Sequence, residues 1–240
     1  MRIISIFFVL IQLTVIPLAK ATDELESPSD LFFEFKAGNF IPNVDDEFGG
    51  NGPFKTIFGD KGSILYAMQL DYKLFKGFGT LSIGGQAGFY WIKGNALLED
   101  GTPSEDETAL WLLPTGVKLT YRFDELNRRW NIPVVPFIKG GLTYTFWWIT
   151  QGDGSIATFG DNQSGAKASG GTYGWEFSAG LALCLNYFDP ASAKNLDLET
   201  GINASYIFVE WVYNSSDNFG GSNVLMVGGD YFLFGIGLEF

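Results

Sequence analysis

The chain has 240 residues, a formal net charge of −12, no histidine and a single cysteine, Cys184. Such acidity argues against nucleic-acid binding, which needs a basic surface, and one cysteine cannot form an internal disulfide framework. The composition is 46% hydrophobic and 17% aromatic, with 31 glycines. Beyond the N-terminus no apolar run approaches the ~20 residues of a transmembrane helix, so the apolarity is spread over alternate residues, as in a transmembrane β-barrel.

The first 21 residues, MRIISIFFVLIQLTVIPLAKA, have the organisation of a secretory signal peptide. Arg2 forms the positive n-region, an apolar region follows over residues 3–18, and Ala19-Lys20-Ala21 is an A-x-A cleavage site. An uncleaved membrane anchor is the alternative, but polar residues and a proline interrupt the apolar region. We therefore expect cleavage after Ala21 and a mature domain over residues 22–240.

Eight stretches of the mature chain alternate apolar and other residues, which is the pattern of a β-strand with one apolar face. Each is at least as long as the ~9–11 residues that a tilted strand needs to cross a bilayer. In chain order the predicted strands are 31–40, 63–75, 80–93, 109–123, 134–149, 173–187, 198–213 and 224–240. The sequence thus predicts an all-β protein that forms a closed antiparallel barrel.

The connections between these strands alternate in length. The second, fourth and sixth are shorter and the others are mostly longer, which is typical of periplasmic turns and extracellular loops. An even strand count then places both termini in the periplasm. A further hairpin hidden in residues 41–62 or 150–172 would raise the count to ten.

Aromatic residues cluster near both ends of the predicted strands, as expected for girdles at the two membrane interfaces. The tryptophans near the long-loop ends are Trp91, Trp111, Trp147, Trp148, Trp175 and Trp211. The aromatic residues near the opposite ends are Phe75, Phe78, Phe123, Trp130, Tyr187, Phe188 and Phe240.

The last stretch, residues 224–240, ends on a phenylalanine preceded by apolar residues at every second position. These residues are Phe232, Phe234, Ile236, Leu238 and Phe240. The pattern resembles the closing strand of bacterial outer-membrane barrels, which the barrel-assembly machinery recognises as an insertion signal. A soluble sandwich edge strand is the weaker interpretation, because an exposed apolar edge invites aggregation.

Charged residues within the strands lie almost entirely on the face opposite the apolar one. Five are acidic, namely Glu34, Asp71, Glu176, Glu199 and Glu239, and five are basic, namely Lys36, Lys73, Lys118, Arg122 and Lys139. The interior of an eight-stranded barrel is just wide enough for side chains, so this balanced set most simply forms a salt-bridged plug. A relay or a narrow ion path is the alternative, since ionisable residues at membrane depth are often functional. Glu210 departs from the pattern and is expected outside the hydrocarbon region or after a bulge.

The chain offers little catalytic chemistry. Without a histidine, no imidazole can activate a serine, and no GxSxG, HExxH, Walker or GxGxxG motif occurs. We therefore expect no enzyme activity and no cofactor. Acidic loop residues at 45–47, 99–100, 105–107, 153, 161 and 217 offer oxygen ligands that divalent cations and lipopolysaccharide would share. They lack EF-hand or RTX spacing, so solvated loops are the simpler interpretation.

Four segments together resemble a family of small, largely uncharacterised outer-membrane β-barrel proteins of the myxobacterial type. They are GPFKTIFGDKG, LTYRFDEL, IPVVPFIKGGLTYTFWW and FDPASAKNLDLETGIN. The resemblance implies fold and location and brings no activity or site residue. We expect an integral outer-membrane protein, in contact with lipid and lipopolysaccharide, with a structural, envelope or surface-interaction role. A narrow channel or transport component for small solutes is the alternative.

Overall fold

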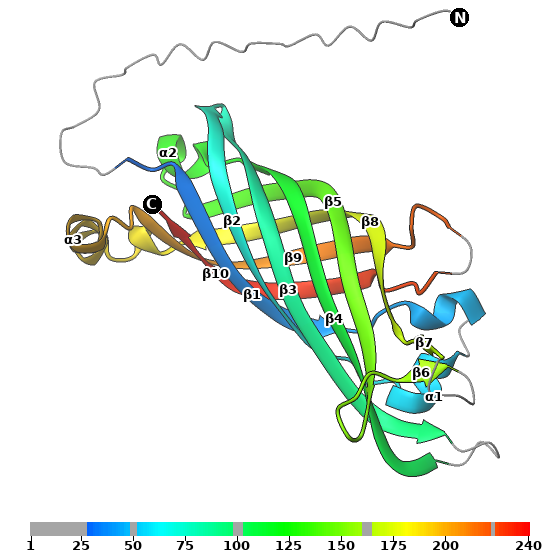
Figure 1. Cartoon of the computed structure of the whole chain (residues 1–240). Coiled ribbons are helices and arrows are strands. Elements are labelled where there is room, and N and C mark those ends of the chain that lie inside the picture. The colour runs from blue at the N-terminus through cyan, green and yellow to red at the C-terminus, as the bar shows by residue number, and fades with distance from the viewer. Residues whose placement is uncertain (1–27, 49–51, 98–102, 160–164, 222–223) are drawn as a thin grey trace, which may run out of the picture.

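Figure 1 shows the computed structural model of the chain, which describes residues 28–48, 52–97, 103–159, 165–221 and 224–240. The expected signal peptide and the acidic residues Glu99, Asp100 and Asp161 lie outside these ranges. Eight strands close an antiparallel barrel in the spatial order β1-β2-β3-β4-β5-β8-β9-β10, and β10 pairs back with β1. No helix within the described ranges is long and apolar enough to cross a membrane.

The prediction of a closed eight-stranded barrel is confirmed. The barrel strands are β1 Leu31–Phe40, β2 Ser63–Gly77, β3 Gly79–Leu97, β4 Pro103–Arg122, β5 Val134–Gln151, β8 Ser169–Cys184, β9 Ala204–Ser216 and β10 Gly229–Glu239. A hairpin does occur within residues 150–172, formed by β6 Thr158–Phe159 and β7 Ala166–Lys167. It forms a separate two-stranded sheet, so the barrel keeps eight strands.

The helices lie at the two ends of the barrel (Figure 1). The C-terminus, α2 Glu125–Trp130 and α3 Pro190–Thr200 lie at one end, called here the terminus end. The short helix η1 Val44–Phe48, α1 Pro53–Phe58, β6 and β7 lie at the other, called here the loop end. A further helical turn, η2 Leu185–Tyr187, leads from β8 toward α3.

Alternation along each strand gives an apolar outer face, and in the middle of the barrel it gives a polar inner face. On β2, Met68, Leu70 and Tyr72 are each more than half exposed, whereas Gln69 and Asp71 between them are at most 1% exposed. A soluble protein arranges its side chains the other way round. An apolar outer band with an inward polar face gains free energy only where the band meets hydrocarbon.

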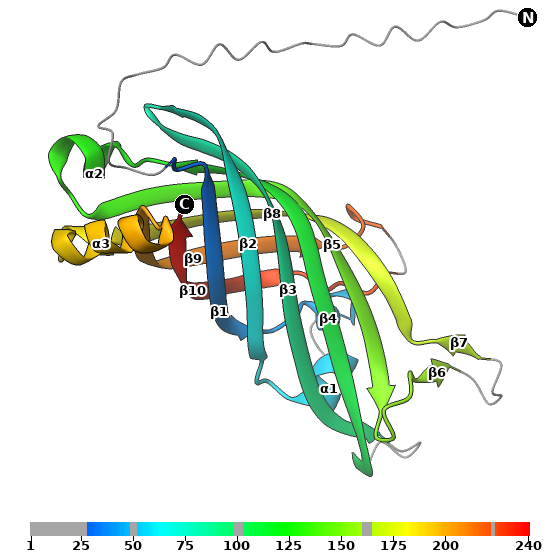
Figure 2. The ribbon, with the colours of Figure 1, turned by 60° about the vertical axis from the view of Figure 1, so that its left-hand side comes forward.

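The barrel wall is higher on one side. β3, β4 and β5 have 19, 20 and 18 residues, against 10 for β1 and 11 for β10. Figure 2 shows these three strands continuing past the loop ends of β1 and β2. At Gly94 of β3, a Cβ atom would overlap the carbonyl oxygen of Ile57, so a glycine is what lets α1 lie against this wall.

Two expectations about the seventh predicted strand are wrong. Residues 198–203 are not strand, because Pro190 in the first turn, a side-chain cap from Asp189 and Gly201 in the left-handed conformation define α3. Glu199 is therefore an exposed helix residue at the terminus end and not a barrel-interior charge.

The strand that follows, β9, also has its faces reversed relative to the prediction. Alternation over residues 198–213 puts Tyr206 and Phe208 on the apolar face, which the sequence predicts to meet lipid, but both side chains point inward, and Ile207 and Trp211 point outward. Glu210 is consequently in phase with the inward face and fully buried. No bulge or position outside the hydrocarbon region is needed to explain it.

Candidate functional site

The inward side chains fill the barrel in three layers. A mainly aromatic layer lies toward the terminus end, a charged layer lies in the middle, and an apolar cluster lies at the loop end. Their order follows from the register, because each strand contributes one inward residue in every two along its length.

Four residues of the middle layer form a closed ring of alternating charge, called here the ion ring. The carboxylate of Glu210 on β9 lies 2.6 Å from Lys36 Nζ on β1 and 2.8 Å from Lys139 Nζ on β5. Glu34 on β1 lies 2.6 Å from Lys139 Nζ and 3.4 Å from Lys36 Nζ. All four side chains are at most 2% exposed. Since β5 is not a neighbour of β1 or β9, the ring joins walls that are not hydrogen-bonded to each other.

Further polar groups extend this layer toward both ends. Arg122 donates to Glu34 at 2.8 Å, and Gln69 links Lys36 to Asp71 through bonds of 3.1 and 2.8 Å. Nearer the loop end, Lys118 pairs with Glu176 and donates to Gln86. Glu176 also accepts from Asn214 at 3.0 Å, and Asn214 accepts from Ser216 at 2.6 Å. Because each buried charge faces an opposite charge, the layer avoids the desolvation cost of an unpaired ion.

On the side of the terminus end, aromatic side chains cover the ion ring. The guanidinium of Arg122 lies 3.3 Å from the centroid of Phe32, and Lys139 Nζ lies 4.8 Å and 5.5 Å from the centroids of Phe137 and Phe208. At the rim, Glu239 pairs with Lys73 and accepts from the Tyr206 hydroxyl at 3.0 Å. The inward aromatic residues of β9 therefore have polar partners in the lumen, because Phe208 lies near the Lys139 ammonium and Tyr206 donates to Glu239.

The loop end of the lumen is closed by a cluster of apolar side chains, called here the loop-end cluster. Its buried members are Phe40, Val44, Phe54, Leu65, Tyr90, Ile92, Leu110, Leu112, Val212, Val227, Tyr231 and Leu233. Phe58, Trp147, Ile149 and Leu225 pack against them. Trp147 thus faces inward and does not belong to the outer girdle in which the sequence placed it.

The predicted interior residues fall into two groups. Glu34, Lys36, Asp71, Lys73, Lys118, Arg122, Lys139, Glu176 and Glu239 all lie on the inward face, and Glu199 does not. Glu210 faces the lumen in place of Glu199, so the described part of the lumen still holds five carboxylates and five cations from the strands. Sequence reasoning missed Glu210, although its phase with Val212 and Asn214 on β9 was the signal that would have found it.

The residues of the expected insertion signal lie on β10 and its end. Phe232, Phe234 and Ile236 point outward and are exposed, while Leu238 and Phe240 are half-buried. Phe240 and Leu31 exchange two backbone hydrogen bonds of 2.9 Å, which close the barrel at the terminus end. The terminal residue thus belongs to the seam between the first and last strands.

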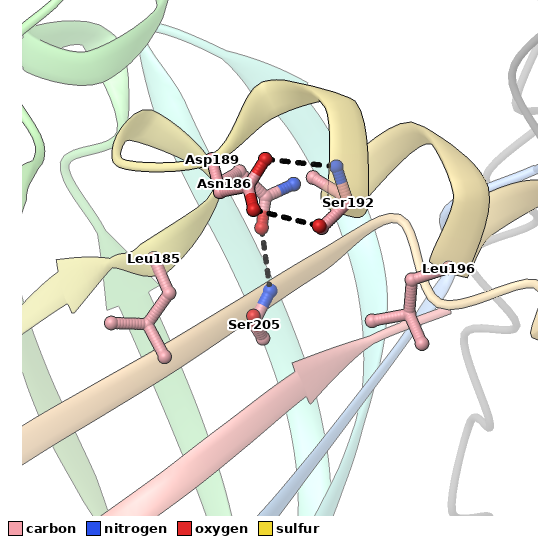
Figure 3. A pocket seen from close by; sticks show the side chains of 7 residues that line it. Leu185, Asn186, Asp189, Ser192, Leu196 and Ser205 are labelled. Carbon is pink, nitrogen blue, oxygen red and sulfur yellow. Dashed lines mark hydrogen bonds between the residues drawn. The ribbon is translucent and has the colours of Figure 1, made fainter.

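A hollow lies outside the lumen, between α3 and the rim of the barrel (Figure 3). It has a volume of about 280 Å³ and is bordered by Leu185, Ala193, Leu196 and Ser205, among others. Asp189 accepts from the backbone and hydroxyl of Ser192 at 3.0 and 2.7 Å, and these bonds lower the pKa of Asp189. Asn186 accepts from the backbone of Ser205, so the polar groups drawn there serve the local fold.

Several of the acidic loop residues that the structure describes have local partners. Asp45 accepts from the backbone of Phe54 and Lys55, Asp153 from Ser155, and Asp217 from Ser215. Within the described ranges, no group of three or more metal-ligating side chains comes together.

Comparisons with known proteins find similar folds only among solved structures, since no family model and no curated protein matches the chain. Neisserial surface protein A is 12% identical over 88% of this chain and 97% of its own, with a TM-score of 0.46. The outer membrane protein OprG from Pseudomonas aeruginosa is 13% identical over 90% of this chain and 97% of its own, with a TM-score of 0.46. The outer membrane enzyme PagL is 13% identical over 87% of this chain and 99% of its own, with a TM-score of 0.41. At such identities and scores, none of them informs the role of this chain.

The chain's own structure identifies its class. A closed barrel of eight strands, an apolar outer band and a lumen filled by paired charges make it an integral β-barrel of the outer-membrane type.

Proposed function

We propose that this protein is a closed, non-conducting outer-membrane barrel whose interactions are made by its loop end. In this proposal the termini face the periplasm and the loop end faces the outside. The signal peptide expected from the sequence and the one-residue turn between β2 and β3 at the terminus end support this orientation.

The loop-end cluster is the observation that carries the proposal. Ions cross a pore through water, and twelve buried apolar or aromatic side chains at one end of the lumen oppose a hydrated path there. Three of them, Val44, Phe54 and Val227, come from connections between strands. The loops therefore fold into the mouth and do not line a vestibule.

Planar-bilayer recording of the purified protein tests this proposal. We expect no stable conductance steps above those of bilayers that received denatured protein. Stable steps that scale with the amount of native protein would contradict it.

A narrow channel is the second candidate, and the continuous charged layer in the middle of the lumen favours it. Neutralising Lys118, Arg122 and Glu176 changes conductance or ion selectivity only if ions pass that layer. Trimming the loops removes surface binding or an envelope phenotype under the leading proposal and leaves conductance untouched.

We also propose a non-enzymatic role. PagL is named an outer membrane enzyme, so this type of barrel does not itself decide the question. The support comes from the sequence, which lacks a histidine in all 240 residues and so has no imidazole base.

Assembly is proposed to depend on Phe232, Phe234, Ile236, Leu238 and Phe240 as the signal that the barrel-assembly machinery reads. Deleting Phe240 should lower the folded amount in the outer membrane and leave protein in the periplasm. Refolding in detergent, where no machinery reads the terminus, should change far less. Heat-modifiable gel mobility measures both, and equal outer-membrane levels of deletion variant and wild type would contradict the proposal.

A further inference from the structure

The apolar outer band of the barrel differs in height around its circumference. On β5 it runs from Val134 to Trp148, which is about 35 Å along the barrel axis for strands tilted by about 40°. On β9 it runs only from Ile207 to Tyr213, about 15 Å, and the polar Ser215 is the next residue on that face. The band of an outer-membrane barrel is typically about 25 Å tall, so one side exceeds that height and the other falls short of it.

The two sides share a common limit at the terminus end. Val134 on β5 opposes Leu183 on β8, and Leu183 opposes Ile207 on β9, so apolar residues meet across all three strands there. The ends of β10 and β1 are also apolar, because Phe240 and Leu31 exchange backbone hydrogen bonds of 2.9 Å. The difference in height therefore arises at the loop end, where β3, β4 and β5 continue past β1 and β2 (Figure 2).

The aromatic girdle at the loop end descends from β5 to β9. The last outward aromatic residue within β5 is Trp148, but within β8 it is Tyr173, which opposes Tyr144. Within β9 it is Tyr213, which opposes Phe177. Each step covers four residues, from position 148 to 144 and from 173 to 177, which lowers the girdle by at least about 7 Å along the axis. Since tryptophan and tyrosine mark the level of the lipid headgroups, that level is inclined around this barrel.

The lower side of the band also covers β10 and β1. On β10 the outward face changes from Phe232 to the exposed Asp230, which opposes Tyr213 of β9. On β1 the exposed Asn39 lies on the same face as Phe35. The band is thus low on both sides of the seam between the first and last strands.

A bilayer of uniform thickness cannot match both sides. If it matched β9, the stacked indoles of Trp111 and Trp148, whose centroids are 6.1 Å apart, would stand above the hydrocarbon. If it matched β5, Ser215 and Asp230 would lie within the hydrocarbon. Mismatch has a free-energy cost that grows with each Å, and lipids reduce it by thinning or thickening locally.

We propose that the barrel holds the leaflet at its loop end at two levels, drawn in beside β9, β10 and β1 and raised beside β3, β4 and β5. The partner of this inclined surface is lipid, with short or disordered acyl chains on the lower side and extended chains on the higher side. A rigid tilt of the barrel would also level the girdle, but it would displace the matched limits at the terminus end. The lumen plays no part in this inference, so it is independent of the closed-barrel proposal.

A gadolinium-chelating lipid headgroup measures the headgroup level on each strand. The full-length barrel is placed in nanodiscs of dimyristoylphosphatidylcholine that contain a small fraction of this lipid, and NMR reads the paramagnetic relaxation of backbone amides. At the loop end, Leu113 on β4 and Ser215 on β9 are matched reporters, because the register places them at about the same height. Phe123 on β4 and Ser205 on β9 are the matched pair at the terminus end by the same reasoning.

We expect the relaxation enhancement at Ser215 to exceed that at Leu113 by about threefold or more, and that at Phe123 and Ser205 to agree within about twofold. Equal values at Leu113 and Ser215 would mean a flat leaflet and would overturn the proposal. Unequal values at Phe123 and Ser205 would mean rigid tilt and would also overturn it. Shielding of Leu113 only in nanodiscs that hold two barrels would assign the higher side to a second copy in place of lipid.

A variant with a raised lower side tests the cause. Ser215→Leu combined with Asp230→Leu extends the apolar band on β9 and β10, so the headgroups should move up and the enhancement at Tyr213 should fall about threefold. Lys93→Leu is the matched control, since it extends the band on the higher side and should leave Tyr213 unchanged. An unchanged Tyr213 in the folded double variant would contradict the proposal, and the wild-type comparison decides it if that variant folds poorly.

Discussion

The middle of the lumen and its loop end are built on the same strands, but charged side chains fill the first and apolar side chains fill the second. In the middle, Glu34, Lys36, Lys139 and Glu210 occupy inward positions, and each needs a partner at a set distance. At the loop end the inward positions of the same alternation carry Tyr90, Ile92 and Leu112, which tolerate any apolar neighbour. Charge pairs therefore fix which strand positions face one another, while apolar packing allows a connection such as α1 to enter the mouth.

The largest expected loss of stability follows from removing one carboxylate of the ion ring. Glu34→Ala leaves Lys139, Lys36 and Arg122 without one of their carboxylates in a site that is about 2% exposed. Removing one partner of a buried pair costs about 3–5 kcal/mol, so the urea midpoint of unfolding in detergent should fall accordingly. Lys93→Gln is the control, because its pair with Glu107 is exposed and such pairs contribute about 0–1 kcal/mol. Similar midpoints for the two variants would contradict a structural role for the ion ring.

Leu112→Ala tests the packing of the loop-end cluster in the same urea-unfolding assay. Leu112 is 1% exposed in the loop-end cluster, and a buried leucine truncated to alanine loses about 2–5 kcal/mol, depending on how far the site collapses. We expect a loss near 3 kcal/mol, below that of Glu34→Ala, because connections can settle into the space. A loss as large as that of Glu34→Ala would show that the loop end is as rigid as the middle.

A smaller loss of stability is expected when the Asp45 carboxylate, which accepts from the first turn of α1, is removed. Asp45→Ala removes the acceptor for two backbone N–H groups, and losing a helix cap of this kind costs about 1 kcal/mol. Trypsin cleavage after Lys55 should then speed up by about fivefold, since proteolysis follows the population of the open form. Cleavage after Lys194 on α3 serves as the internal reference, and an equal rise at both sites would mean general destabilisation.

The smallest effect concerns the terminus end and depends on pH. The bonds from Ser192 place the pKa of Asp189 below its ordinary value in the folded state. The capping contribution to α3 is therefore fully present above the unfolded pKa of about 3.9 and is lost as the pH falls through the lower folded value. Carbon chemical shifts of α3 should move toward coil values over that window in wild type. Asp189→Asn should remove the pH dependence, and a wild-type helix that is unchanged down to the lowest pH would refute the assignment.

The sequence predicts the barrel well because lipid imposes a simple rule on its exterior. Apolar residues at every second position, such as Met68, Leu70 and Tyr72, gave the strand count and the outward face. The rule fails where the interior is itself aromatic. Tyr206 and Phe208 read as lipid-facing, but they point inward to Glu239 and to the Lys139 ammonium, which alternation alone cannot reveal.

The remaining differences have local causes. Capping by Asp189 and termination at Gly201 outweigh the alternation that had placed Glu199 in a strand. The ion ring itself was beyond sequence reasoning, because which cation meets which carboxylate depends on contacts across the lumen between strands that are not neighbours. The loop-end cluster was missed for a similar reason, since Val44 and Phe54 lie in a connection whose folding into the mouth has no periodic signal.

The higher side of the barrel wall, formed by β3, β4 and β5, also gives the protein an optical property. Trp91, Trp111 and Trp148 lie at one level on β3, β4 and β5, with ring centroids 6.4 and 6.1 Å apart and interplanar angles of 22° and 2°. Indoles at this spacing share their electronic excitations, so the three rings act as one coupled chromophore in circular dichroism. The coupling exists only while β4 is in register with both neighbours, and unfolded chains lack it. A couplet that disappears on Trp111→Phe would therefore report the registry of this wall in real time, without any label added to the protein.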